Sequence, residues 1–219
     1  MKNKKRLSTV ALALAMVVLI STAVAYFTDI DTVNNVFTIG EVEIGLEEPD
    51  WTPEEHTKIT PNQTIEKDPT ITNTGINDAF VFLTVEVPYK NIVTADASTG
   101  VKKAAADTEL FTYTLNNGWV EIGTPVKDAN KGTVTHLYAY GTGSACTVLA
   151  PGAKATELFS TVTFVNAIED QGLEKQEVNI PVKAYAIQTT DLTDNDVTTP
   201  GEVWKLVASQ NEVKGAPAF

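Results

Sequence analysis

The sequence predicts an all-β protein, an antiparallel jelly-roll-like β-sandwich with one or two short helices. Apolar and polar residues alternate with a period of two along several segments rich in Val, Ile, Thr, Tyr and Phe. Gly, Pro, Asn and Asp separate these segments, as is typical of turns between strands. Strands do not alternate with long helical patterns, so a parallel sheet is not indicated.

The expected strands follow one another between residues 37 and 188. In segment 37–46 the alternation places Val42, Ile44 and Leu46 on one face. An acidic, proline-containing loop is expected at residues 47–61. The remaining strands are expected at residues 64–73, 79–87, 110–115, 119–122, 133–140, 156–165 and 177–188.

One hairpin turn stands out among the turn signals, and helical signals are scarce. Asn117 and Gly118 form the strongest hairpin signal, because both residue types tolerate the positive φ of a type I′ turn. We therefore expect strand 119–122 to return alongside strand 110–115. One or two helical turns are expected at residues 101–106 and again at 200–207, and residues 189–199 are expected to form a polar surface loop.

The first 25 residues have the features of a secretory signal peptide. Basic residues at positions 2–6 precede an apolar centre at 10–20, and the segment ends in Ala23-Val24-Ala25. We expect cleavage after Ala25, which leaves Tyr26 as the first residue of a secreted chain. Segment 26–36 then precedes a single β-sandwich domain at residues 37–219.

The charge of the chain excludes one class of partner. The sequence contains 28 acidic and 16 basic residues, and its net charge is −12. A negative field of this size repels nucleic acid and anionic membrane surfaces. We therefore expect no nucleic-acid binding. Because no second long apolar run follows the signal, we also expect no stable membrane anchor after cleavage.

Three stretches resemble the TasA/camelysin family of biofilm-matrix and cell-surface proteins. They are residues 25–40, which begin AYFTD and end NVFTIG, residues 65–75 (IEKDPTITNTG) and residues 182–188 (VKAYAIQ). The resemblance implies processing by a SipW-type signal peptidase and secretion to the cell surface or the extracellular matrix. It also implies the strand order of the sandwich and assembly into extracellular fibres by donor-strand complementation.

Segment 26–36 is the candidate donor strand. An added strand satisfies the edge amides and carbonyls of its acceptor, and such a head-to-tail contact propagates into a filament. The alternative is that this segment pairs within its own domain. Cleavage after Ala25 would free the segment and start assembly. The apolar side chains expected to make the contact are Tyr26, Phe27, Ile30, Val33 and Val36.

A surface metalloprotease of the camelysin kind is the alternative function, and it would use His56 or His136. These are the two histidines of the chain, and neither belongs to an HExxH motif. We expect His56 in a loop and His136 on the solvent-facing side of a strand. No enzyme activity, metal ion or cofactor is therefore expected.

A monomeric glycan- or partner-binding sandwich is the third candidate, with Trp51, Trp119 and Trp204 as a stacking platform. Their wide spacing favours core or edge packing instead. Cys146 is expected to be a small buried apolar residue. An acidic group at residues 191–202 is expected to be a solvated loop rather than a calcium site; it contains Asp191, Asp194, Asn195, Asp196 and Glu202.

Overall fold

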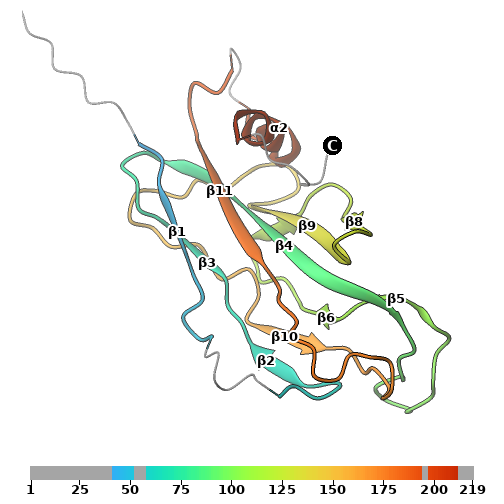
Figure 1. Ribbon diagram of the computed structural model, residues 1–219. Helices are drawn as coiled ribbons and strands as arrows, with labels where there is room; N and C mark the ends of the chain where they lie inside the picture. Colours follow the sequence, from blue (N-terminus) through green and yellow to red (C-terminus); the bar gives the residue numbers. More distant parts are fainter. Residues whose placement is uncertain (1–40, 52–57, 194–196, 212–219) are drawn as a thin grey trace, which may run out of the picture. The chain divides into compact units, whose positions relative to one another are not determined.

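The computed structural model describes residues 41–51, 58–193 and 197–211 (Figure 1). Within this part of the chain, no helix combines the length and the apolar character needed to cross a bilayer. Several expected features lie outside the described residues: the signal peptide 1–25 with Ala23 and Ala25, the donor segment 26–36 with Tyr26, Phe27, Ile30, Val33 and Val36, the loop residue His56, and Asp194, Asn195 and Asp196.

The largest sheet is antiparallel and is built around two long strands, β4 (Ala79–Ile92) and β9 (Thr133–Tyr140). Its strand order is β11-β4-β9-β7, where β11 is Val182–Gln188 and β7 is Trp119–Glu121. Two short strands extend its far end. β5 (Ala106–Glu109) pairs with the last residues of β4, and β8 (Val126–Asp128) pairs with β9 (Figure 1).

Two smaller antiparallel sheets face the large one. β1 (Ile44–Glu47) pairs with β3 (Thr70–Asn73), and β2 (Thr64–Glu66), β10 (Thr161–Phe164) and β6 (Phe111–Thr112) form a sheet in the order β2-β10-β6. Together with the large sheet they enclose a common core. The prediction of an all-β antiparallel sandwich is confirmed.

Both faces of the large sheet are buried, each in its own hydrophobic cluster. Successive side chains of β4 point to opposite sides of the sheet and so belong alternately to the two clusters. On the inner face, Val81, Leu83, Val85 and Val87 of β4 are fully buried against residues of the small sheets. On the outer face, Phe80 and Phe82 join a second cluster that includes the helix. Partly buried Val42, Ile44 and Leu46 pack against the inner core, as the alternation predicts.

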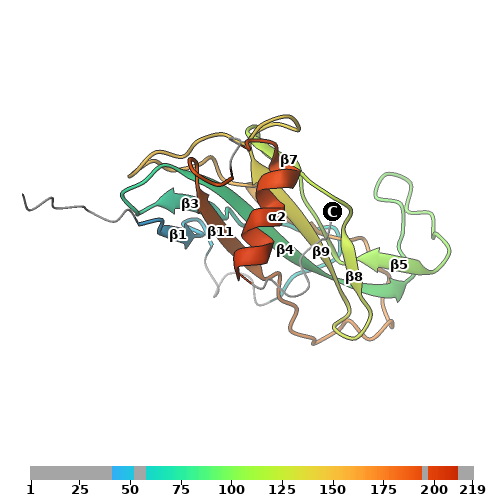
Figure 2. The same ribbon diagram turned by 90° about the horizontal axis from the view of Figure 1, so that it is seen from above.

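The helix that covers the outer face is α2 (Pro200–Asn211), which lies across β11, β4 and β9 in Figure 2. The carbonyl of Thr199 accepts hydrogen bonds from the backbone amides of Glu202 and Val203, so Thr199 is the residue that caps the helix. Pro200 suits the first helical position, because an amide is not required there. Trp204 is 1 % exposed and its ring contacts Phe82. The expected short helix at 200–207 is confirmed and continues to residue 211.

The expected strand 64–73 is divided into two strands that belong to different sheets. β2 pairs with β10, whereas β3 pairs with β1. The change of direction falls at Lys67–Pro69, where proline has no amide to donate to a ladder. Asp68 accepts a hydrogen bond of 3.0 Å from the amide of Asp50, which stabilises the crossing.

The expected hairpin at Asn117 and Gly118 is wrong. Gly118 has a φ of 96°, but Asn117 is absent from the residues with positive φ, so the turn is not type I′. β6 pairs with β10, while β7 pairs with β9. The turn therefore carries the chain from one sheet to the other, since each flanking strand finds its hydrogen-bond partner elsewhere.

Other elements differ in extent. The expected helical turn at 101–106 is absent. The backbone amide of Asp96 donates to the carbonyl of Val101, and the amide of Lys103 donates to the carbonyl of Thr94, so this segment folds back on residues 94–96 instead of forming a helix. β5 follows from residue 106, and β8 had no expected counterpart. The expected strands 110–115, 156–165 and 177–188 are shorter in the structure, and the strand expected at 79–87 continues to Ile92.

Candidate functional site

A cleft of about 740 Å³ lies beside β6, over the inner face of β9. Four aromatic rings line it, from Tyr89, Phe111, Tyr113 and Tyr138. The charged groups that line it are Asp107, Glu109, Glu121, Lys127 and His136. The cleft therefore combines an apolar wall with the one described histidine of the chain.

His136 occupies the inner face of the large sheet, which corrects the expectation that it faces solvent. It stands opposite the buried Val85 in the β4–β9 register and shares a face with Tyr138, a core residue. Only 14 % of its side chain is exposed. The alternation along β9 did not reveal this, because apolar residues occupy both faces of that strand.

Two carboxylates from neighbouring strands bind the two ring nitrogens of His136. The distance from Nδ1 to Glu121 Oε1, on β7, is 2.7 Å, and the distance from Nε2 to Glu109 Oε2, on β5, is 2.9 Å. Ionised carboxylates only accept hydrogen bonds, so both nitrogens must donate, which requires a protonated ring. Sequence analysis missed both glutamates, because they lie 15 and 27 positions from His136 in the chain.

The surroundings set the pKa of His136 through opposing effects. Burial disfavours the charged ring, but the hydrogen bonds and charges of Glu109 and Glu121 outweigh it, so the pKa is raised above its ordinary value of 6.5. The ring of Tyr138 is stacked on the imidazole, with 6.2 Å between ring centroids. The His136 ring is therefore held in one orientation by contacts on its face and at both nitrogens.

Two tyrosines close the apolar side of the cleft. Their hydroxyl oxygens, on Tyr113 and Tyr138, are hydrogen-bonded at 2.9 Å. Burial is the main cause that raises the pKa of both hydroxyls well above 10. Both hydroxyls therefore stay neutral over the physiological pH range and serve as hydrogen-bonding groups rather than bases.

At the rim of the cleft, Lys127 of β8 forms an ion pair with Asp107 of β5. The Lys127 ammonium also lies 4.0 Å from the centroid of the Tyr89 ring. Hydrogen bonds from Lys127 and Asn91 lower the pKa of Asp107. These side chains are well exposed, so the pair positions the rim more than it stabilises the fold.

A second groove, lined by apolar and charged side chains, lies between β2 and the segment that leads into β11. One part, of about 310 Å³, is lined by Ile65 of β2 and by Val178 and Ile180. The adjoining part, of about 490 Å³, is lined by Phe164, Leu173 and again Val178. We call these two pockets together the seam groove, because β2 and β11 are the outermost strands of their sheets.

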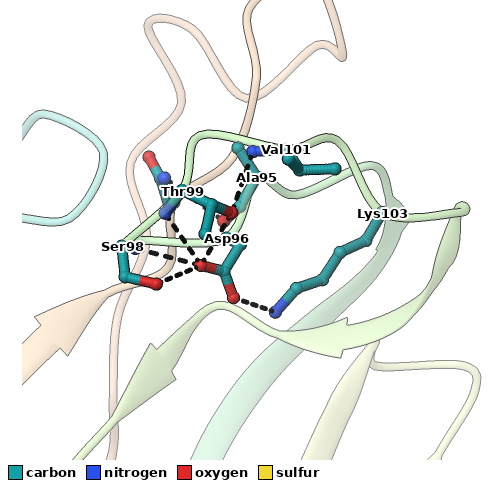
Figure 3. Close-up of polar contacts among 7 residues, drawn as sticks. Ala95, Asp96, Ser98, Thr99, Val101 and Lys103 are labelled. Carbon is teal, nitrogen blue, oxygen red and sulfur yellow. Dashed lines mark hydrogen bonds and ion pairs between the residues drawn. The ribbon is translucent and has the colours of Figure 1, made fainter.

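The loop that follows β4 holds an unusually acidic carboxyl, but its bonds are internal. Figure 3 shows the Asp96 carboxylate surrounded by Ser98, Thr99 and Lys103. Asp96 Oδ1 accepts hydrogen bonds from the amides and hydroxyls of both Ser98 and Thr99, and these bonds hold its pKa well below the ordinary value. This arrangement stabilises the turn and provides no binding site.

The remaining candidate residues have structural roles. Cys146 is buried in the outer cluster, and burial raises the pKa of its thiol to about 12, so it is an inert apolar residue as expected. Trp119 and Trp204 are buried in separate clusters, whereas Trp51 is partly buried beside the ammonium of Lys67. The three rings form no common platform, which confirms the packing interpretation.

Comparison with known proteins gives a family for the N-terminal part of the chain. The camelysin metallo-endopeptidase family matches residues 1–102. No curated protein and no solved structure matches the chain. The matched range includes β1 to β4 and two of the three stretches on which the resemblance rests, and it ends before Glu109, Glu121 and His136.

Proposed function

We propose that this chain, whose residues 1–102 match the camelysin metallo-endopeptidase family, is a secreted structural protein that assembles into extracellular matrix fibres. In this proposal a SipW-type signal peptidase removes residues 1–25. The freed segment 26–36 then adds as a strand to the next copy of the chain. The product is a head-to-tail homopolymer at the cell surface or in the matrix, without a stable membrane anchor.

The observation that carries the proposal is the seam groove. Ile65 of β2 lines it, and β2 is an outermost strand of its sheet, so a strand added beside β2 would extend that sheet and cover apolar side chains. Its lining includes Ile65 of β2, Val162 of β10, and Val178 and Ile180 of the segment before β11. The five apolar residues of segment 26–36 have the chemistry that such a lining accepts.

Electron microscopy of the chain that starts at Tyr26 tests this proposal. We expect filaments from it and none from the same chain without residues 26–36. Val178→Arg places a charge in the seam groove and should also abolish filaments while leaving a folded monomer. Val101→Glu is the matched control, because Val101 is 64 % exposed and lines neither pocket of the seam groove, and it should leave filaments unchanged.

One result would contradict the proposal, and another would contradict only the seam groove as the acceptor. Monomers from every chain, across a range of protein concentration, pH and salt, would exclude polymer assembly as the function. Filaments that persist in Val178→Arg but disappear without residues 26–36 would retain the donor strand and place its acceptor elsewhere.

A metallo-endopeptidase is the second candidate, and the name of the matched family is what favours it. The described residues do not fit a metal ion. No group of three or more His, Cys, Asp or Glu side chains among them is arranged to hold one, and both nitrogens of His136 already bind carboxylates. A peptidase assay with added zinc decides this point. Activity that is lost in His56→Ala or His136→Ala would favour the enzyme over the fibre.

A further inference from the structure

We propose that Glu109, His136 and Glu121 form a proton-dependent clasp that joins β5 and β7 to β9 across the floor of the cleft. The three residues come from three strands, and His136 lies between the two carboxylates at 2.9 and 2.7 Å. This device does not depend on the proposed function, since it uses no residue of the seam groove.

The chemistry of imidazole makes the clasp a switch. A protonated ring has two N–H donors and satisfies both glutamates at once. A neutral ring has one donor and one lone pair, so one nitrogen then faces a carboxylate oxygen at hydrogen-bond distance with no hydrogen between them. Loss of the proton therefore replaces an attraction with a repulsion at either Glu109 or Glu121.

β5 is the strand that loss of the His136 proton should affect most. Its ladder pairs it with residues 89–92 at the end of β4, and no ladder joins it to β7 or β9. Its first two residues are exposed and its last two are partly buried. The contact between Glu109 and His136 thus provides a link from β5 to the body of the sheet, and its loss should open β5 first.

The other groups around His136 do not compensate for its charge. Lys127 of β8 is paired with Asp107 of β5 at the rim, and Tyr113 and Tyr138 are bonded to each other. From β4, the residue opposite His136 is the apolar Val85, and Tyr89 holds the ammonium of Lys127. The two glutamates are therefore the groups that determine whether His136 keeps its proton.

The direction of the pH effect follows from the raised pKa of His136. A group whose pKa is higher in the closed state stabilises that state fully at pH values below its pKa in the open state. The stabilisation is lost as the pH rises through the raised value. The ratio of open to closed β5 should then increase by about tenfold for each unit by which the closed-state pKa of His136 exceeds its pKa in the open state, where Glu121 remains beside the ring.

Nuclear magnetic resonance with labelled histidine tests the clasp, because the chain has two histidines and His56→Gln leaves the signal of His136 alone. We expect His136 to titrate above 6.5. Amide exchange of β5, corrected for intrinsic rates, should show protection at about pH 5 that falls by about pH 8.5. His56→Gln should retain this fall, and His136→Gln should show low protection at both values.

Glu109→Gln provides a second variant if His136→Gln does not fold. Its side-chain amide can donate to a neutral ring, so it should lower the pKa of His136 and remove the pH dependence of β5 exchange. A pKa of His136 at or below 6.5 in the native chain would overturn the proposal. Equal protection of β5 at both pH values in the native chain would do the same.

Discussion

Replacing Trp204 by alanine measures how much α2 contributes to the fold. Trp204 is 1 % exposed between the helix and the outer face of the large sheet, where its ring lies 5.4 Å from Phe82 and 5.3 Å from Tyr185. A buried tryptophan removes about 200 Å² from water, which at about 25 cal/mol per Å² gives about 5 kcal/mol. Substitution of such side chains typically costs about 3–5 kcal/mol, so we expect Trp204→Ala to lower the free energy of unfolding by that amount.

Urea denaturation followed by far-ultraviolet circular dichroism is the assay, since it does not depend on the removed fluorophore. With a denaturant slope of about 2 kcal/mol per M, the midpoint should fall by about 2 M. Lys205→Ala is the control, because Lys205 lies next in the helix and is exposed. A loss below about 1 kcal/mol in Trp204→Ala would refute the reasoning and show that α2 is peripheral to the cooperative unit.

Three further predictions follow from buried or constrained groups. Cys146 should resist a thiol reagent at about pH 8 in the native state and react fully in urea, because burial holds its pKa at about 12; rapid native reaction would contradict this. Gly141→Ala should lower the unfolding free energy by about 1–3 kcal/mol in thermal denaturation, because φ is 150° and the added carbon would lie 2.3 Å from the carbonyl oxygen of Ala145; Gly143→Ala, with open space around it, should cost much less. Tyr113→Phe should cost about 0.5–1.5 kcal/mol in urea denaturation through loss of the hydroxyl hydrogen bond, and an unchanged midpoint would argue against that bond.

Strand positions were predictable where the pattern of side chains was local. The expected strand 133–140 coincides with β9, and the alternation of Val42, Ile44 and Leu46 matches their packing. The burial of Cys146 was also expected from its apolar neighbours. A period of two reports which residues share a face, and that information is contained in a few consecutive residues.

Strand pairing was not predictable from the same patterns. Asn117 and Gly118 have the chemistry of a hairpin, yet β6 and β7 pair in different sheets. The segment around Pro69 shows continuous β-forming residues, yet the chain crosses between sheets there. A turn or a strand propensity does not specify the partner, because the partner is chosen by long-range hydrogen bonds and shared burial.

Local patterns in the sequence predicted the all-β class, the approximate positions of most strands and a family resemblance, which the family match over residues 1–102 supports. The positions of two sites became visible in the folded chain alone: His136 points inward between Glu109 and Glu121, and apolar residues of β2, β10 and the segment before β11 share one groove. The physical reason is common to both sites. Their residues are distant in the chain and meet through antiparallel pairing and packing of separate sheets, which no local pattern encodes.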